Sequence, residues 1–252
     1  MHPFHRSRLF VCAALVCAVA ARADWDLGGP HKMHFPQLPD LNGWDVNVSD
    51  YVLADDWQCS MSGPIPQIHF WISWTNDLQS PITNIHLSIH DNVPEPPFSR
   101  PGELLWHDDF DPASFQIRNW ETGLQGWLDP LSNFWRWPDH MTIWQVNVGM
   151  HPGNIFFQMI SNIYWLDIKL DVLPPGKAGW KTCFTNFMDD AVFWTGEGWQ
   201  ELRSPEVPFP SLDLAFVIDP MPEPAAAALV VSVWLAVRRL QRSAARPARQ
   251  HA

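Results

Sequence analysis

The sequence predicts an all-β domain, built as an antiparallel two-sheet sandwich or jelly roll and flanked by an N-terminal signal helix and a short apolar C-terminal helix. Three observations support this fold class. Apolar and polar residues alternate with a period of two through much of residues 24–219, which is typical of strands that bury one face. Proline and glycine clusters separate these segments. Long uninterrupted apolar runs lie only near the two ends of the 252-residue chain.

The first 23 residues have the three parts of a secretory signal. A basic stretch precedes the apolar run Leu9–Ala20, and a small-x-small cleavage site follows at Ala21 and Ala23. Twelve apolar residues span only about 18 Å, which is less than the ~30 Å hydrocarbon core of a bilayer. The pattern therefore favours a cleaved signal over a membrane anchor, and we expect the mature chain to begin near Asp24.

Residues 220–252 carry a second targeting signal. Its parts are the motif Pro222, Glu223 and Pro224, the apolar segment 225–237, and a basic tail that opens with Arg238 and Arg239. This order resembles the PEP-CTERM sorting signal. The resemblance implies transient retention in the membrane and processing by an exosortase-type membrane peptidase. The arginines fit a cytoplasmic tail by the positive-inside rule. We expect an exported protein of the cell envelope or the extracellular space.

The charges are divided unevenly between the domain and its ends. Half of the 16 Lys and Arg residues lie in the two end segments, whereas 26 of the 27 acidic residues lie in residues 24–219. The domain therefore has eight bases and a formal charge of −18. Nucleic acid is excluded as a partner because its binding requires clustered cations. Neutral polymers and divalent cations remain compatible with this charge.

Five segments show the strand pattern most clearly. They are residues 68–74, 85–89, 142–148, 164–172 and 212–218. Clusters of proline lie between them, for example at residues 94–97 and 205–210. Neither an internal repeat nor a linker divides residues 24–219, so we expect a single domain there.

Short motifs within the domain are similar to those of a known family. They include Leu53-Ala54-Asp55-Asp56-Trp57, Gly179-Trp180-Lys181-Thr182, Asp189-Asp190-Ala191-Val192-Phe193-Trp194 and Asp213-Leu214-Ala215-Phe216. The first resembles the "ADDF" opening of an exported bacterial β-sandwich family that is often joined to a PEP-CTERM tail. That family has no assigned function. The resemblance implies a fold and a destination but no catalytic residue.

Tryptophan is the most unusual feature of the composition. All of the 16 tryptophans except Trp234 lie in the domain. Packing in the core is the ordinary role of this residue. Six are candidates for a ligand-binding surface because they lie on the second face of a strand or in a loop: Trp71, Trp135, Trp137, Trp165, Trp194 and Trp199. Exposed indoles beside carboxylates and amides can stack on sugar rings. The alternative is that loops cover the second face and make it a second core.

Acidic residues occur in several pairs. Asp108, Asp109 and Asp111 form the most ligand-like group and are a candidate calcium site, because calcium prefers oxygen ligands from aspartate clusters. The alternative is that aspartates accept backbone N–H groups at turns, which we favour for Asp55-Asp56 and Asp189-Asp190. No cofactor other than calcium is indicated.

The domain contains two cysteines, Cys59 and Cys183, which are a candidate disulfide in an oxidising compartment. The sequence alone does not decide whether they meet in space.

No recognised catalytic motif is present. We expect a non-enzymatic exported protein that binds or structures extracellular polysaccharide. The alternatives are a secreted carbohydrate-active hydrolase, which requires two carboxyl groups facing each other across a cleft, and a purely structural surface protein.

Overall fold

The computed structural model describes residues 24–220. The predicted signal with its cleavage residues Ala21 and Ala23 lies outside the described residues. So does the predicted sorting signal, including Pro222, Glu223, Pro224, Arg238 and Arg239. Within residues 24–220, no helix has the length and apolar character needed to cross a membrane.

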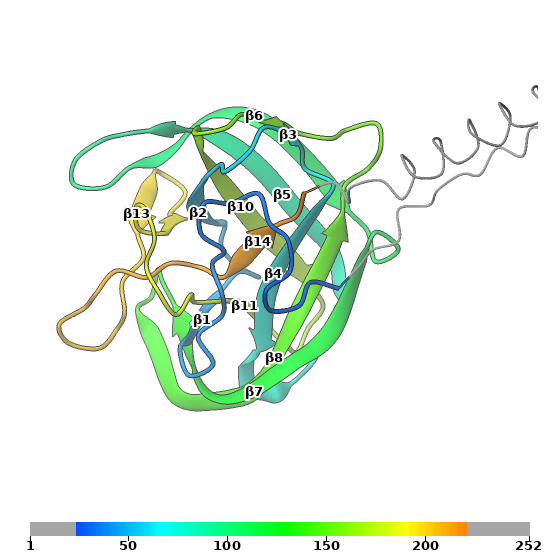
Figure 1. The fold of residues 1–252 in the computed structure, drawn as a ribbon. Coiled ribbons are helices and arrows are strands. Elements are labelled where there is room, and N and C mark those ends of the chain that lie inside the picture. Colours follow the sequence, from blue (N-terminus) through cyan, green and yellow to red (C-terminus); the bar gives the residue numbers. More distant parts are fainter. Residues whose placement is uncertain (1–23, 221–252) are drawn as a thin grey trace, which may run out of the picture.

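The first of two large sheets closes into a partial barrel (Figure 1). In spatial order its strands are β11 (Ala178–Lys181), β1 (Trp44–Asn47), β7 (Phe115–Asp129), β8 (Phe134–Gly149), β4 (Gln67–Trp74) and β14 (Phe216–Ile218). Strand β11 also pairs with the end of β4, where Gly179 lies opposite Ser73. This pairing joins β4, β8, β7, β1 and β11 into a ring.

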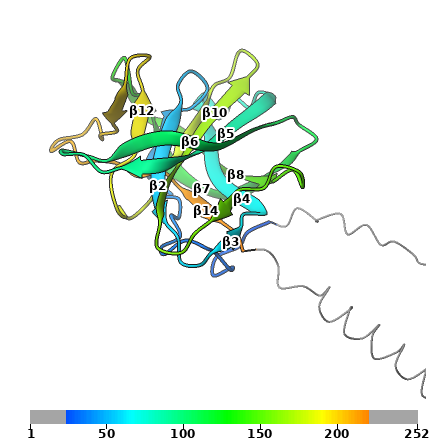
Figure 2. The ribbon, with the colours of Figure 1, turned by 90° about the horizontal axis from the view of Figure 1, so that it is seen from above.

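The second large sheet is open and packs against the first (Figures 1 and 2). Its strands, in spatial order, are β13 (Trp199–Glu201), β12 (Val192–Trp194), β2 (Leu53–Gln58), β10 (Ile163–Val172), β5 (Ile82–Val93) and β6 (Arg100–Phe110). Strands β3 (Gly63–Pro64) and β9 (Phe157–Gln158) form a separate two-stranded sheet. A 3-10 turn, η1 (Thr75–Asp77), follows β4.

The predicted alternation places one face of each of the five predicted strand segments in the main core. On β4 the residues concerned are Ile68, Phe70, Ile72 and Trp74, and on β10 they are Leu166, Ile168 and Leu170. Together with the matching residues of β5 they fill the space between the two sheets. The all-β prediction is therefore confirmed for the described residues.

Three details differ from the predicted antiparallel sandwich. The pairing of β11 with β4 closes the first sheet into a partial barrel. Strands β1 and β7 pair in parallel, with Asp45 opposite Trp127. The predicted strand 212–218 is regular only over β14, because Leu214 donates its N–H to Asp55 Oδ2 at 2.6 Å instead of to a neighbouring strand. A side-chain acceptor thus replaces a backbone acceptor in this segment.

Candidate functional site

Two of the six candidate tryptophans, Trp71 and Trp165, are fully buried. Trp71 packs in a second core with Trp25, Ile143 and Val217. The prediction that these two indoles face a ligand is therefore wrong, because other parts of the chain cover the second face of their strands.

Trp165 lies in a third small core. It packs against Ala54 and Val192, with Phe98 and Trp199 at the edge. Its indole N–H donates to Asn92 Oδ1 at 2.8 Å. The second face of β10 is therefore covered too, in line with the alternative that this face forms a second core.

Trp194 and Trp199 form a cross-strand pair on β12 and β13. Their ring centroids lie 5.3 Å apart in an edge-to-face arrangement. Trp194 is exposed, whereas Trp199 is half-buried against the core around Trp165. This pair offers only one open indole.

Trp135 and Trp137 are the most open pair of candidate indoles. They project from the start of β8 with 46% and 37% of their surface exposed. Both meet the buried Trp44 edge-to-face, at centroid distances of 5.8 and 5.2 Å. We call Trp135 and Trp137 the indole platform.

Side-chain hydrogen bonds hold the hairpin that carries the indole platform. Asp129, at the end of β7, accepts hydrogen bonds from Tyr51 Oη at 3.0 Å and from Asn47 Nδ2 at 3.2 Å. It also accepts the backbone N–H and the hydroxyl of Ser132 within the turn. Arg136, between the two indoles in sequence, pairs with Asp139. These contacts hold the hairpin that carries the indole platform in place on the domain.

Gly126 makes room for the indole platform. A Cβ atom at this position would overlap ring atoms of both Trp44 and Trp137. We expect Gly126→Ala to lower the free energy of unfolding by about 1–3 kcal/mol, the usual cost of overpacking, as measured by urea unfolding. Gly153→Ala is the matched control, because a Cβ atom there would meet nothing within 4 Å. Equal stability of the two variants would contradict this packing.

A cavity of about 750 Å³ lies elsewhere, beside β7. Trp120 forms one wall of this groove together with the apolar side chains of Leu38, Leu41 and Phe184. Phe184 is 77% exposed, which is unusual for a large aromatic side chain. We call this cavity the Trp120 groove.

Polar groups surround the apolar wall of the Trp120 groove. Asp26, Asn42, Arg118 and Glu121 line it. The Arg118 guanidinium lies 5.0 Å from the Trp120 ring centroid and donates to Asp26 Oδ1 at 2.6 Å. An indole face with carboxylate, amide and guanidinium groups at its rim is suited to a neutral polyhydroxylated ligand.

Sequence reasoning missed Trp120 because the groove has four separate origins. The strand β7 contributes one wall, and residues 26–27, 38–42 and Phe184 contribute the others. A usable signal was the sequence Arg118-Asn119-Trp120-Glu121, in which an indole stands between charged residues on a strand. That signal identifies a polar neighbourhood but not a cavity.

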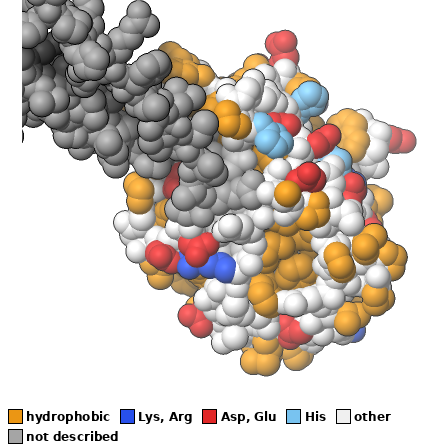
Figure 3. All heavy atoms as spheres, turned by 90° about the vertical axis from the view of Figure 1, so that its right-hand side faces the viewer, with side chains coloured by type: hydrophobic (Ala, Val, Ile, Leu, Met, Phe, Trp, Pro, Cys, Tyr) orange, Lys and Arg blue, Asp and Glu red, His pale blue; other side chains and the backbone are white. Residues whose placement is uncertain are grey.

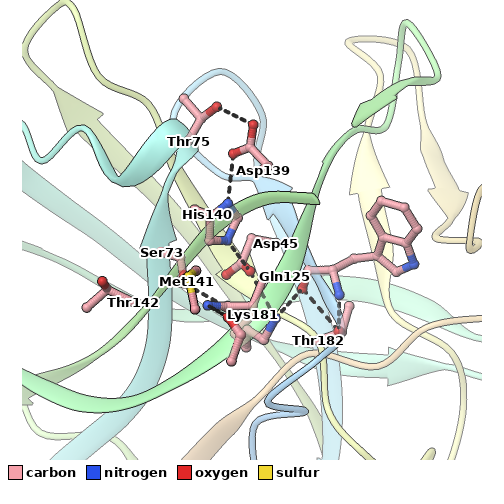
Figure 4. Close-up of polar contacts among 12 residues, drawn as sticks. Asp45, Ser73, Thr75, Gln125, Asp139, His140, Met141, Thr142, Lys181 and Thr182 are labelled. Carbon is pink, nitrogen blue, oxygen red and sulfur yellow. Dashed lines mark hydrogen bonds and ion pairs between the residues drawn. The ribbon is translucent and has the colours of Figure 1, made fainter. Parts of the chain in front are cut away.

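A buried ion network lies on the face of the ring away from the main core (Figure 4). Lys181 Nζ and His140 Nε2 both contact Asp45 Oδ2, at 3.0 and 2.8 Å. His140 Nδ1 contacts Asp139 Oδ2 at 2.8 Å, and Ser73 donates to Gln125 Oε1 at 3.0 Å. The five ring strands thus each contribute at least one buried polar side chain.

The network shifts the pKa values of its members. Burial alone would lower the pKa of His140, but the Asp45 charge and hydrogen bonds to Asp139 and Asp45 raise it to about 9. Burial lowers the pKa of Lys181, against the opposing effect of Asp45. The side chains of Asp45, His140 and Lys181 are fully closed off from solvent.

Three buried carboxyl groups form a second unusual cluster. Asp55, Asp56 and Asp213 are at most 1% exposed. Burial, and then the charges of neighbouring carboxylates, raise the pKa of Asp213 to about 7 and raise those of Asp55 and Asp56 well above their usual value. Asp55 accepts the N–H of Leu214, as expected for an acceptor of backbone N–H groups. The expected turn is not found at this pair, because Asp55 and Asp56 lie in strand β2 and are both buried.

The candidate calcium ligands do not come together. Asp108 and Asp109 are consecutive residues of β6, so their side chains point to opposite faces of the sheet. Asp108 contacts His151 at 2.8 Å, Asp109 contacts His86 at 2.7 Å, and Asp111 accepts the N–H of Ala113 at 3.0 Å. Among residues 24–220, no three acidic, histidine or cysteine side chains are arranged to hold a metal ion.

The candidate disulfide is not formed. Cys59 and Cys183 are both buried free cysteines. The backbone of Cys59 forms an isolated β-bridge with Met33, and that of Cys183 forms one with Pro39. Different segments therefore hold the two thiols. Burial raises the pKa of each thiol to about 12.

Comparison with known proteins adds one positive result. No curated protein and no solved structure matches the chain. A family model described as a domain of unknown function, DUF7901, matches residues 33–219. This range includes both large sheets and most of the Trp120 groove. The chain belongs to the DUF7901 family.

Proposed function

We propose that this chain is an exported, non-enzymatic protein that binds neutral polysaccharide in the Trp120 groove. The observation that carries the proposal is the 750 Å³ cavity, in which an indole wall is surrounded by carboxylate, amide and guanidinium groups. Sugar rings present C–H faces to an indole and hydroxyl groups to a polar rim. The groove offers both kinds of contact.

Charge supports a neutral ligand over an anionic one. The formal charge of residues 24–219 is −18, and Arg118, the cation of the groove, is already paired with Asp26. The surface in Figure 3 shows many acidic and hydrophobic side chains and few Lys or Arg side chains. A polyanion such as alginate would be repelled.

The buried carboxyl groups of the domain do not support the hydrolase alternative. A glycosidase needs a protonated carboxyl group that faces the substrate. The carboxyl groups with the highest pKa values, those of Asp55, Asp56 and Asp213, are buried and do not line the groove. In the groove itself, Asp26 forms an ion pair with Arg118, and its carboxylate is suited to accepting a hydrogen bond from a sugar hydroxyl group.

The second part of the proposal concerns where in the cell the protein is delivered. Residues 1–23 are proposed to direct export, and the PEP-CTERM-like segment is proposed to be retained in the membrane and processed by an exosortase-type peptidase. A polysaccharide-binding domain delivered in this way would act at the cell envelope or outside it.

Replacing Trp120 with alanine tests the proposed binding site. We expect the unchanged chain to be retarded in native gels that contain hydroxyethyl cellulose, glucomannan or dextran, and not in gels that contain alginate. Loss of a central aromatic contact typically costs 2 kcal/mol or more, so Trp120→Ala should weaken binding by about 30-fold.

The matched control is Trp144→Ala, which removes another half-buried indole that does not line the groove. It should bind as the unchanged chain does. Variants Trp135→Ala and Trp137→Ala show whether the indole platform binds instead. The proposed function is wrong if none of the three neutral polysaccharides retards the unchanged chain.

A further inference from the structure

The first four described residues, Asp24–Leu27, lie across the ring of strands beside the Trp120 groove. Asp24 Oδ1 accepts a hydrogen bond from Asn147 on β8 at 2.9 Å. The Trp25 carbonyl oxygen accepts one from Gln145 at 2.8 Å and another from Arg118 at 2.6 Å. We call these four residues the N-terminal strap.

The indole of Trp25 is the anchor of the N-terminal strap. It is 3% exposed and donates its N–H to Pro30 O at 3.0 Å. It meets Trp71 edge-to-face at 6.0 Å and stacks on Trp120 at 6.5 Å, while Trp71 and Trp120 meet at 5.3 Å. Trp25 therefore completes a group of three mutually contacting indoles, one of which is the wall of the groove.

The strap also holds the guanidinium of the groove. Arg118 donates to the Trp25 carbonyl oxygen and to Asp26 Oδ1, both at 2.6 Å, and Asp24 lies 3.5 Å away. From β8, Gln145 Oε1 accepts a hydrogen bond from Arg118 Nε at 2.8 Å. Three of the four polar contacts that orient this guanidinium thus come from the strap.

Two strap residues line the groove themselves. Asp26 belongs to its polar rim, and Leu27, which is 70% exposed, belongs to its apolar surface. Without the strap the groove would lose both side chains, the support behind Trp120 and the partners of Arg118. The main core would remain, because Trp25 is not part of it.

We propose that the N-terminal strap assembles the binding groove and that Trp25 is its positioning residue. This inference rests on the proposed function and specifies how its site is formed. Asp24 directly follows the predicted cleavage residue Ala23, so cleavage there leaves the whole strap on the mature chain. Cleavage four residues later would remove it and leave an incomplete site.

The test uses the full chain with Trp25→Ala and two measurements. In native gels that contain hydroxyethyl cellulose, glucomannan or dextran, binding should weaken by about tenfold or more. Hydrogen exchange of the backbone amides in residues 117–122 should become faster, which reports on the wall of the groove independently of any sugar. Trp25→Phe keeps an aromatic ring against Trp71 and Trp120, and should restore binding to within about threefold of the unchanged chain.

Trp106→Ala is the matched control, because Trp106 is also a buried indole with one N–H bond to a backbone oxygen, Asn154 O at 2.9 Å. It should leave binding and exchange in residues 117–122 unchanged. Equal effects of Trp25→Ala and Trp106→Ala would overturn the strap's positioning role and indicate general destabilisation. If the unchanged chain binds no polysaccharide, the proposed function fails, and unchanged exchange in Trp25→Ala would overturn the strap separately.

Discussion

Asp45→Asn is expected to lower the free energy of unfolding by about 3–5 kcal/mol, the usual effect of removing one partner from a buried ion network. Asp45 is fully buried and is the shared acceptor for Lys181 and His140. In the variant, a neutral amide would face both a buried ammonium and a buried imidazolium. Both side chains are fully buried, so bulk solvent cannot compensate for the lost charge.

Urea unfolding at pH 7 measures this effect, with Asp50→Asn as the matched control. Asp50 pairs with Lys177 at the surface, where the two side chains are 43% and 49% exposed. Solvent screens such a pair, so its loss should cost no more than about 1 kcal/mol. Similar losses in the two variants would contradict a stabilising role for the buried network.

Stability should fall as the pH rises from about 4 to about 9. A group whose pKa is raised by folding stabilises the folded state at low pH, and this contribution is lost as the pH rises through the folded pKa. The pKa of Asp213 rises from 3.8 to about 7, and that of His140 rises from 6.5 to about 9. The two groups therefore act in the same direction over successive pH ranges.

The expected sizes follow from the linkage relation. Asp213 accounts for a loss of about 4 kcal/mol between pH 4 and pH 7, and His140 for about 3 kcal/mol between pH 6.5 and pH 9. Below pH 4 the trend reverses. Hydrogen bonds from His140 and other groups outweigh the effect of burial and lower the pKa of Asp139 to about 2. Protonation of Asp139 at low pH therefore lowers the stability of the folded state. Stability should thus be greatest near pH 4–5.

The variant Asp213→Asn isolates the first of these groups. The side-chain oxygen of asparagine can still accept the N–H of Phe187, but the group no longer titrates. We expect a flatter dependence between pH 4 and pH 7 and greater stability than the unchanged chain at pH 8, measured by urea unfolding at each pH. The same slope in both proteins would show that Asp213 does not titrate in this range.

The strands were predictable because burial repeats along the chain. Ile68, Phe70 and Ile72 alternate with polar or aromatic residues, and all three lie in the main core. The parallel pairing of β1 and β7 leaves no comparable trace, since a strand that buries one face has the same pattern in either direction. Nearness in sequence makes Asp108 and Asp109 look like joint ligands, but both belong to β6, where consecutive side chains point to opposite faces.

The candidate site was less predictable because it depends on contacts between distant segments. Trp71 lies on the second face of β4, as expected, but Trp25 covers that face from 46 positions earlier in the chain. Trp25 also stacks on Trp120. Its position, which the strand pattern does not predict, therefore explains both why Trp71 is buried and why Trp120 was not among the candidates. Alternation assigns a residue to a face but does not show what covers that face.

The most direct measurement is a titration of the ¹⁵N-labelled protein with cellohexaose and mannohexaose, followed by the indole N–H resonances of its tryptophans. Trp120→Phe assigns the resonance of Trp120 by its loss. Binding in the Trp120 groove predicts that this resonance shifts first and most, together with that of Trp25 stacked on it. Shifts confined to Trp135 and Trp137, or no shift at any indole, would contradict binding in the groove.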